Sequence, residues 1–223
     1  AMHASVVEHP TEIMKTDKSM NIVVFGGTGD VGQEIVRKLI AQNKKVTVLT
    51  RQNKQSSDKI NYVTGDVLDY ASVENCMEDP GQIIIALGFN NSALDTMSKG
   101  TRNILDSMKV KNCKRVVCLS AQGVGDSWDY MPTEFKEMVM ADPVLGASFK
   151  DHSIQEDIIK SSDFEWTIVR PTEIIDSVES KNFTVNFPTE SSTFQISKYD
   201  VAQFIIDQLA DNSFSGQTVM ITS

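Results

Sequence analysis

Four glycines near the start of the chain have the spacing that suits a nucleotide's phosphates. Gly26, Gly27, Gly29 and Gly32 satisfy both G-x-G-x-x-G, read from Gly27, and the wider G-x-x-G-x-x-G, read from Gly26. Glycines permit a tight turn and let the backbone approach a pyrophosphate closely, and the first N–H groups of a following helix point at that anion. The pattern predicts a dinucleotide site, with an ordinary glycine-rich turn as the alternative.

The residues after the next apolar run indicate which dinucleotide binds. An NAD site places Asp or Glu about twenty residues past the glycines, where it holds the ribose hydroxyls. Here that stretch reads Leu49-Thr50-Arg51-Gln52 and contains no carboxylate. The planar guanidinium of Arg51 suits a 2′-phosphate instead. The sequence therefore predicts NADP(H), and the alternative is a solvated surface arginine at a strand end.

Ser120 and His152 are the candidates for catalysis. Ser120 follows an apolar run and could hydrogen-bond the nicotinamide carboxamide or the acceptor, which would fix the geometry of approach. Its alternative role is simply to end a strand. His152 could donate or accept a proton near neutral pH, or it could be solvated at a helix start. His3 and His9 are the other histidines, and no cluster of residues predicts a metal site.

Carbonyl–alcohol chemistry lacks its usual residues in this chain. A tyrosine with a lysine four residues later often protonates the nascent alcohol in reductases. Glu134 follows Tyr130 at that spacing, and Gln203 follows Tyr199. Hydride delivery to a flat conjugated ring needs no such pair, because solvent can protonate the product. The absent pair therefore disfavours carbonyl–alcohol chemistry and, with it, a sugar-nucleotide epimerase.

Four further residues are the expected walls of the acceptor pocket. Trp128 and Tyr130 lie in a long connection, residues 122–148, and offer faces on which a conjugated ring could stack. Long connections of this kind are usually functional lids or mobile segments. Thr172 and Glu173 follow a later strand at the same sheet edge. The two aromatic side chains could instead pack against a helix of their own connection, near residues 133–140.

The elements that must position these residues alternate between strand and helix. Apolar runs predict strands at 21–25, 46–49, 60–64, 82–87, 114–119, 165–169 and 218–221. Helical spacing predicts helices at 35–40, from about 70, and at 91–110, 151–160 and 198–209. Segments 183–187 and 193–196 could pair as a small outer hairpin. The fold class is therefore α/β, a doubly wound parallel sheet in a single domain, residues 20–223. Residues 1–19 are expected to be a disordered tail or a remnant of recombinant expression.

Composition narrows the class of protein and its partners. The 223 residues are enough for one sizeable domain, and 40% of them are hydrophobic. A formal net charge of −9 argues against binding to nucleic acid or to an anionic membrane. Cys76, Cys113 and Cys118 form no C-x-x-C pattern, which suits reduced thiols in the cytoplasm. We expect a monomer or a weak homo-oligomer.

Several stretches together resemble a known family. GGTGDVG, VTVLTR, GDVLD, KGTRNI, KRVVCLSA and TIVRP resemble the atypical short-chain dehydrogenase/reductase group with NmrA-like Rossmann domains. The resemblance covers Met20 to the C-terminus and is greatest to the biliverdin-IXβ reductase/flavin reductase proteins, which share Ser120 and the Asp151-His152 pair. It implies that NADP(H) contacts Gly26, Thr28, Gly29, Asp30, Val31, Arg51, Asp66, Val67, Ala86, Leu87, Gly88 and Ser120. Asp66 could accept a hydrogen bond from the adenine amino group, or it could cap the helix near Tyr70.

The resemblance implies an NADPH-dependent reductase. The acceptor would be a flavin, a quinone-like compound or a linear tetrapyrrole, reduced by hydride transfer. The alternative, from another class, is a non-catalytic NmrA-like regulator that binds NADP and reports its redox state to a partner.

Overall fold

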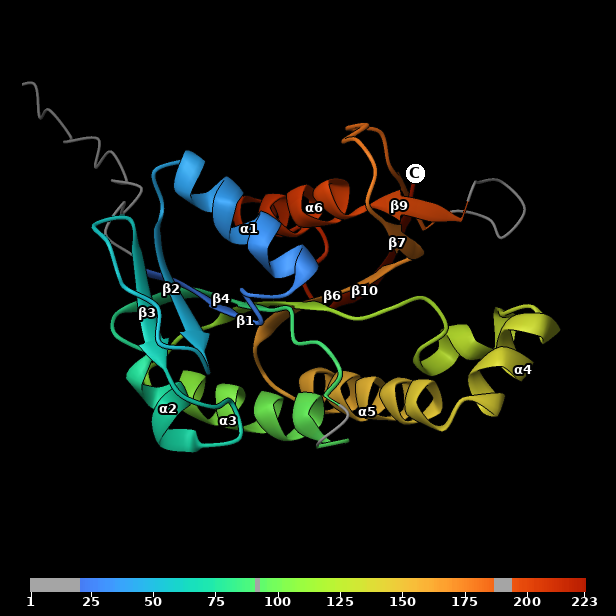
Figure 1. Ribbon diagram of the computed structural model, residues 1–223, viewed down its shortest axis with the longest axis horizontal. Helices are drawn as coiled ribbons and strands as arrows, with labels where there is room; N and C mark the ends of the chain where they lie inside the picture. The colour runs from blue at the N-terminus through green and yellow to red at the C-terminus, as the bar shows by residue number, and fades with distance from the viewer. Residues whose placement is uncertain (1–20, 91–92, 187–193) are drawn as a thin grey trace, which may run out of the picture.

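A central sheet with helices on both faces forms the body of the protein (Figure 1). The computed structural model describes residues 21–90, 93–186 and 194–223. The expected tail, residues 1–19, lies outside these ranges. So do parts of the expected helix 91–110 and of the expected outer hairpin.

Eight strands make up the main sheet in the order β3-β2-β1-β4-β5-β6-β10-β8. Seven are parallel, as expected for a doubly wound sheet, and β8 pairs antiparallel with β10. Their bounds are β1 Asn21–Phe25, β2 Lys45–Thr50, β3 Ile60–Thr64, β4 Pro80–Ile85, β5 Arg115–Leu119, β6 Glu165–Pro171, β8 Thr184–Val185 and β10 Gln217–Thr222. The order reverses between β1 and β4, the switch point at which such folds bind ligands.

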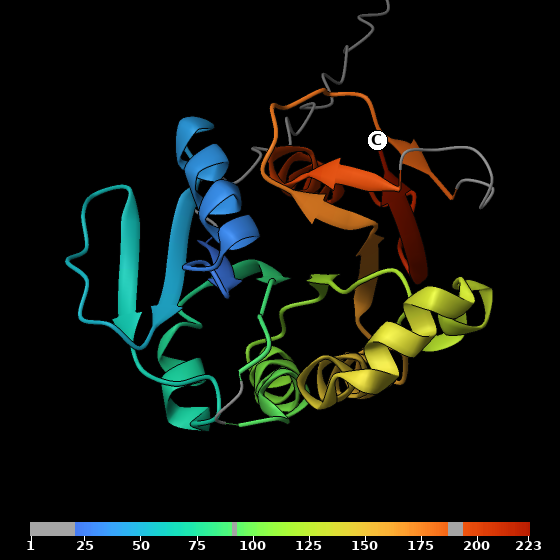
Figure 2. The same ribbon diagram turned by 45° about the vertical axis from the view of Figure 1, so that its right-hand side comes forward.

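Two layers of helices cover the sheet. Helices α1 (Asp30–Ala41) and α6 (Lys198–Ala210) lie on one face, and α2 (Tyr70–Asn75), α3 (Thr96–Val110) and α5 (Pro143–Lys160) lie side by side on the other (Figure 2). The 3₁₀ helix η1 (Gly125–Tyr130) and helix α4 (Thr133–Ala141) connect β5 to α5, and α4 packs against α5.

The alternation of side chains along β1 explains both layers. Ile22 and Val24 belong to the core under α1 and α6, whereas Val23 and Phe25 belong to the core under α2, α3 and α5. Successive strand residues point to opposite faces, so a strand covered on both sides must be apolar throughout. All five residues of β1 are buried and the last four are apolar. The polar first residue, Asn21, accepts a hydrogen bond from the hydroxyl of Thr47 and donates one to the carbonyl of Glu78.

The outer hairpin was predicted with the wrong pairing. The segment at Thr184–Val185 joins the edge of the main sheet through β10. The later segment, β9 (Gln195–Ser197), instead pairs parallel with β7 (Glu173–Ile175) in a separate sheet of two strands. Such short strands carry little pairing information of their own, so contacts distant in sequence decide their partners.

Helix α5 starts eight residues before its predicted start at Asp151. Asp142 caps it by accepting hydrogen bonds from the backbone N–H groups of Val144 and Leu145, and Pro143 occupies the first turn. Both are ordinary helix start signals. The connection 122–148 is therefore mostly ordered helix, with η1, the expected α4 and the first turns of α5.

The loop before β3 folds back along that edge strand. The hydroxyl of Ser56 accepts a hydrogen bond of 2.9 Å from the backbone N–H of Tyr62 and also contacts the Tyr62 carbonyl. The backbone N–H of Ser57 donates to the carbonyl of Ile60 at 2.9 Å. Lys54 lies over the Tyr62 ring at 5.5 Å from its centroid.

Candidate functional site

The glycine turn between β1 and α1 has no room for side chains at two positions. Gly26 has a φ of +86°, and a Cβ there would lie 2.1 Å from the carbonyl oxygen of Ala86. A Cβ on Gly32 would lie 1.9 Å from the carbonyl oxygen of Gly26. Gly29 is the N-cap of α1 and has no side chain with which to cap it, so the first N–H groups of α1 remain available to an anion.

A cavity of about 410 Å³ opens beside this turn, at the carboxyl edge of the strands. The structure places most of the expected cofactor contacts around it: Gly26, Thr28, Gly29, Arg51, Asp66, Val67, Ala86, Leu87 and Gly88. A Cβ on Gly88 would meet nothing within 4 Å, so backbone is open to the cavity there. The cradle of glycine backbone beside an uncapped helix start fits a dinucleotide.

Three of the expected cofactor contacts do not line this cavity. Asp30 and Val31 lie in the first turn of α1, and Ser120 is buried at the end of β5. The sequence analysis missed Phe89, Asn90 and Thr96, which do line it. They follow Gly88 along the chain, and the carboxyl end of a buried strand was the signal that could have found them.

Arg51 stands at the position predicted to choose the dinucleotide. Its side chain is exposed, lines the cavity, and makes no ion pair or hydrogen bond within the described part of the chain. The hydroxyl of Thr50 accepts a hydrogen bond of 3.1 Å from the backbone N–H of Gln52, which shapes the turn after β2. Arg51 is therefore a cation available to a phosphate.

The capping role considered for Asp66 belongs to Asp69. Asp69 accepts hydrogen bonds from the backbone N–H and the hydroxyl of Ser72 at the start of α2. Asp66 instead accepts a hydrogen bond of 2.9 Å from the backbone N–H of Leu68, within its own loop. It also lines the cavity. A contact between Asp66 and adenine stays a prediction.

Ser120 belongs to a buried charged cluster that the sequence analysis missed. Its hydroxyl donates to Glu156 Oε2 at 2.6 Å. Arg170 on β6 binds both carboxylate oxygens of Glu156, at 3.1 Å through Nε and 2.6 Å through Nη2. Its third nitrogen binds Asp126 of η1 at 2.6 Å. Arg170, directly after the apolar pair Ile168–Val169 of β6, was the available signal that a partner of opposite charge exists, since such charges are buried only with partners.

This cluster holds its charges against the cost of burial. Burial alone would lower the pKa of the Arg170 guanidinium, but the hydrogen bonds and charges of Glu156 and Asp126 hold that pKa above its ordinary value. The hydrogen bond from Arg170 lowers the pKa of Asp126. Gly125 passes so close that a Cβ there would lie 2.7 Å from Arg170 Nη2. The cluster thus fastens η1 to the carboxyl edge of β5 and β6.

The protonation of His152 follows from its neighbours. Gln155 donates through Nε2 to the hydroxyl of Thr101 at 3.1 Å, so its oxygen faces His152 Nδ1, which lies 3.1 Å away. Nδ1 therefore carries the hydrogen, and Nε2 is left as an acceptor. Burial lowers the pKa of His152 despite the opposing hydrogen bond to Gln155. Near neutral pH the ring is uncharged.

Asp151, the neighbour of His152, caps another helix. Its carboxylate is buried and accepts hydrogen bonds from the backbone N–H groups of Met97 at 2.9 Å and Ser98 at 3.2 Å, in the first turn of α3. Thr96, the first residue of α3, lines the nucleotide cavity. Helix α5 is therefore joined directly to one wall of that cavity.

The expected acceptor walls separate into different surroundings. Trp128 packs on Phe135 of α4 and Phe149 of α5, each at 6.3 Å between ring centroids, and Tyr130 is 76% exposed. The alternative considered for Trp128, packing against its own connection, is thus what the structure shows. Thr172 is buried with its hydroxyl 2.8 Å from that of Thr222. Glu173 is exposed and accepts a hydrogen bond from Gln195.

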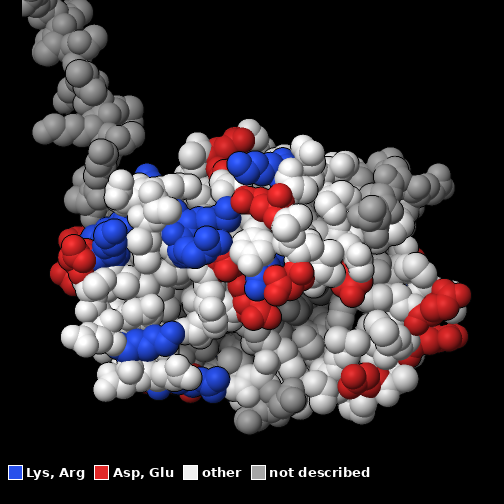
Figure 3. Space-filling view, turned by 45° about the horizontal axis from the view of Figure 1, so that its top comes forward, with Lys and Arg blue, Asp and Glu red and all other residues white. Residues whose placement is uncertain are grey.

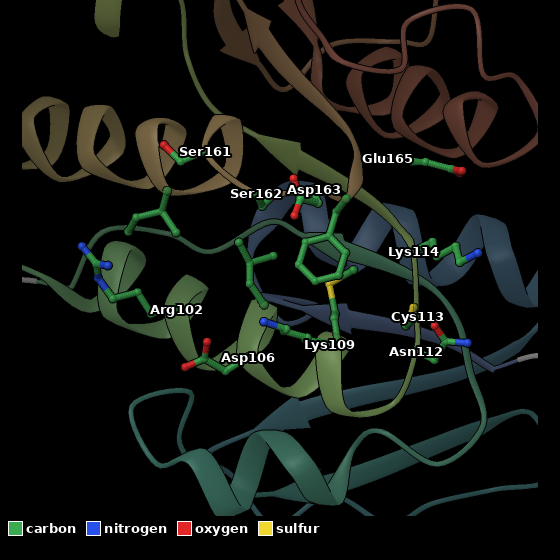
Figure 4. A pocket seen from close by; sticks show the side chains of 14 residues that line it. Arg102, Asp106, Lys109, Asn112, Cys113, Lys114, Ser161, Ser162, Asp163 and Glu165 are labelled. Carbon is green, nitrogen blue, oxygen red and sulfur yellow. The ribbon is translucent and has the colours of Figure 1, made fainter.

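A mostly apolar cavity of about 330 Å³ lies between η1, α4 and α5. Trp128, Val139 and Phe149 form part of its wall, and Ser153 of α5 also lines it. Another cavity, of about 680 Å³, lies at the opposite, amino edge of the sheet (Figure 4). There Arg102 and Asp106 of α3 lie on one side of the cavity, and Ser161 and the loop after α5 lie on the other.

Three further observations concern surface charge, metal binding and membrane-spanning helices. Acidic and basic side chains both occur over the left and middle of the face shown in Figure 3, and the right of that face carries acidic side chains without basic ones. Across residues 21–90, 93–186 and 194–223, no His, Cys, Asp and Glu side chains group so as to hold a metal ion. No helix in those ranges combines the length and apolar character required to cross a membrane.

The order of the strands, the glycine turn and the cavity at the switch point define a Rossmann-type dinucleotide-binding protein. A family profile described as NAD(P)H-binding matches residues 26–212. The chain belongs to this NAD(P)H-binding family, and its cofactor is NAD(P)(H).

Solved structures with the same fold cover nearly the whole chain. The oxidoreductase ylbE of Lactococcus lactis has a TM-score of 0.78 at 16% identity, covering 92% of this chain and 91% of that one. ChuY of Escherichia coli O157:H7, titled an anaerobillin reductase, has a TM-score of 0.75 at 18% identity, covering 91% and 96%. A short-chain dehydrogenase/reductase of Veillonella parvula, in complex with NADP, has a TM-score of 0.75 at 17% identity, covering 92% and 94%.

Two curated proteins also match the chain, and both are longer than it. Prestalk A differentiation protein A of Dictyostelium discoideum is 24% identical over 221 residues, covering 93% of this chain. A UDP-glucose 4-epimerase of Rickettsia bellii is 23% identical over 129 residues, covering 48%. The chain spans 65% and 37% of the lengths of these two relatives.

Proposed function

We propose that the protein is an NADPH-dependent reductase that transfers hydride to a flat conjugated acceptor: a flavin, a quinone-like compound or a tetrapyrrole. The observation that carries the proposal is the cavity at the switch point of the sheet, where Arg51, beside the glycine turn, is a cation with no ion pair to any of the residues that the structure describes. Membership of the NAD(P)H-binding family supports the cofactor class. We further expect a cytoplasmic monomer or weak homo-oligomer.

In this proposal each part of NADPH has its own partner in or beside the cavity at the carboxyl edge of the sheet. The first turn of α1, with Asp30 and Val31, binds the pyrophosphate through backbone N–H groups. Arg51 binds the 2′-phosphate, and Asp66 accepts a hydrogen bond from the adenine amino group. The open backbone at Gly88 lies against the cofactor on the way to the acceptor.

The bound cofactor supplies a hydride, and NADPH, acceptor and one proton become NADP⁺ and the two-electron-reduced acceptor. The residues of the chain orient the partners. Ser120 donates its only hydroxyl proton to Glu156, so it keeps lone pairs that can accept a hydrogen bond from the nicotinamide carboxamide. His152 offers its Nε2 to a donor group of the acceptor. Neither residue has to transfer the proton, which comes from solvent.

The test is acceptor-dependent oxidation of NADPH. We expect the rate at the nicotinamide absorbance band to rise and saturate with added FMN, riboflavin, quinones or biliverdin. A tetrapyrrole belongs in this panel because the similar ChuY structure is titled an anaerobillin reductase. Arg51→Glu should abolish the NADPH reaction, whereas Arg102→Glu, a matched exposed arginine on α3, should not.

A regulator of the NmrA-like type would give a different result. It would bind NADPH as tightly as the enzyme does, yet every acceptor would leave the background oxidation rate unchanged. That outcome would replace the reductase proposal with the sensor.

A further inference from the structure

Two aromatic side chains, Trp128 and Phe149, line the apolar cavity between η1, α4 and α5, and Phe135 packs behind them. Trp128, Phe135 and Phe149 pack on one another, with ring centroids 5.7 to 6.3 Å apart. Gly123 is essential to this geometry, because a Cβ there would lie 2.9 Å from the Phe149 ring and 3.0 Å from the Phe135 ring. At about 330 Å³ the cavity is within the range of small-molecule sites, about 300–1,000 Å³.

One face of α5 connects this cavity to the carboxyl edge of the sheet. Phe149, Ser153 and Glu156 recur at the four- and three-residue spacing of a helix face. The first two line the cavity, and the third receives the hydroxyl proton of Ser120. Three residues of helix span about 4.5 Å, so the cavity begins about one turn from the Glu156–Ser120 pair.

His152 lies on the same side of α5. It precedes Glu156 by four residues, one helical turn, and the Glu156 charge acts on its pKa. The space bounded by Ser153, Phe149 and Trp128 therefore lies next along α5 from an acceptor ring placed between His152 and Ser120.

The residues that line the cavity indicate which part of an acceptor would enter it. Val124, Val139, Met140 and the aromatic rings give an apolar surface, and among the described lining residues Lys150 is the one that carries a charge. Lys150 is exposed, so its ammonium stays at the rim. A polyhydroxylated arm would lose its hydrogen bonds with water inside this space without replacing them.

We propose that this cavity is a second subsite of the acceptor, and that it binds an apolar side arm attached to the conjugated ring. The inference rests on the proposed reductase function and narrows the acceptor class to quinone-type rings with an apolar arm, in preference to flavins. Met140, 77% exposed at the rim, supplies a flexible thioether that adapts to such an arm.

The experiment compares a dimethoxy-methyl-benzoquinone with and without a geranyl arm as acceptors for NADPH. Wild type should have a clearly lower KM for the geranyl compound. Ser153→Leu fills the cavity and Met140→Trp covers its mouth. Either should raise the KM for the geranyl quinone about tenfold, or about 1.4 kcal/mol, and change that of the bare ring less than about twofold.

Met138→Trp is the matched control. Met138 is also exposed on α4, at 53%, but does not line the cavity. We expect its two KM values to equal those of wild type. Equal KM values for both quinones in wild type, or the same response to all three variants, would overturn the subsite.

A binding measurement separates this inference from the proposed function. Trp128 and Trp166 are the two tryptophans, so Trp166→Phe leaves a fluorescence signal from the cavity wall alone. Geraniol should change this signal, and Ser153→Leu should remove the change. If geraniol changes the Trp128 signal and Ser153→Leu removes that change, but no acceptor is reduced, the reductase proposal fails and the apolar site stands. If geraniol leaves Trp128 unaffected, the apolar site is wrong.

Discussion

Arg51 is the residue from which cofactor choice can be tested. Because its guanidinium is unpaired in the nucleotide cavity, NADPH should bind much more tightly than NADH. Arg51→Ala removes a charge-assisted phosphate contact and should cost on the order of 1.5–3 kcal/mol, or about 10-fold to 150-fold in NADPH affinity. Titration of both cofactors against wild type, Arg51→Ala and the control Arg102→Ala measures this. Equal wild-type affinities for NADPH and NADH would contradict the assignment.

His152 gives the folded protein a pH-dependent stability. Burial lowers its pKa below the ordinary 6.5 in the folded state. As the pH falls below about 6.5, the unfolded chain therefore binds a proton that the folded protein does not, and the free energy of unfolding decreases. Above that pH the stability contribution is fully present.

Urea unfolding at several pH values checks this expectation. His152→Gln should remove the part of the pH dependence that lies just below neutrality, leaving the carboxylate effects at lower pH. No other histidine lies in the described residues, since His3 and His9 precede them. Identical pH profiles for wild type and variant would show that the His152 ring is not perturbed.

At the residue scale, the sequence predicted what depends on neighbouring positions in the chain. The glycine turn and Arg51 are local patterns, and the structure places both at the same cavity. The Ser120–Glu156–Arg170 cluster was not predictable, because its members come from β5, α5 and β6. Only the fold decides that a lone arginine in β6 meets a lone glutamate of α5.

Among the elements, α5 and α3 are joined by a cap that crosses between helices. Asp151→Ala removes the acceptor of two first-turn N–H groups of α3, and should destabilise the protein by about 2 kcal/mol. It should also weaken cofactor binding, since Thr96 of the same turn lines the nucleotide cavity. Thermal unfolding and a cofactor titration measure the two effects.

Two companion variants show whether the cap is the cause. Asp151→Asn keeps an acceptor oxygen and should lose less stability than Asp151→Ala. Asp157→Ala changes an exposed aspartate of the same helix and should stay within about 0.5 kcal/mol of wild type. A loss at Asp157 as large as that at Asp151 would refute the capping role.

Element types were predicted better than element ends and pairings. Strong periodicity located the parallel strands and most helices, because each element needs an apolar face in its own sequence. The start of α5 was not predicted although Asp142 and Pro143 are start signals, because the glycines and prolines between residues 122 and 148 are also typical of a loop. The outer hairpin failed because two- and three-residue strands take their partners from the folded context.

On the scale of the whole molecule, the three thiols report on global unfolding. Burial raises the pKa of Cys76 to about 12 and that of Cys113 to about 11, and it also raises the pKa of Cys118. The thiolate is the reactive form, so iodoacetamide should label none of them rapidly in the native protein and all three in urea. Mass spectrometry counts the labels. Rapid native labelling of any one thiol would show a local opening at that site.

The folding back of the loop onto β3 has a consequence for how the protein meets other copies of itself. An edge strand with unpaired backbone groups is a template on which another chain can add a strand. Here Ser56 engages the backbone N–H and carbonyl of Tyr62 at the middle of β3, and Lys54 lies over the ring of that residue. A strand of another copy could pair with β3 only after the hydrogen bonds between Ser56 and Tyr62 were broken and the loop was displaced. The loop therefore hinders aggregation through this edge strand, independently of what the cavities bind.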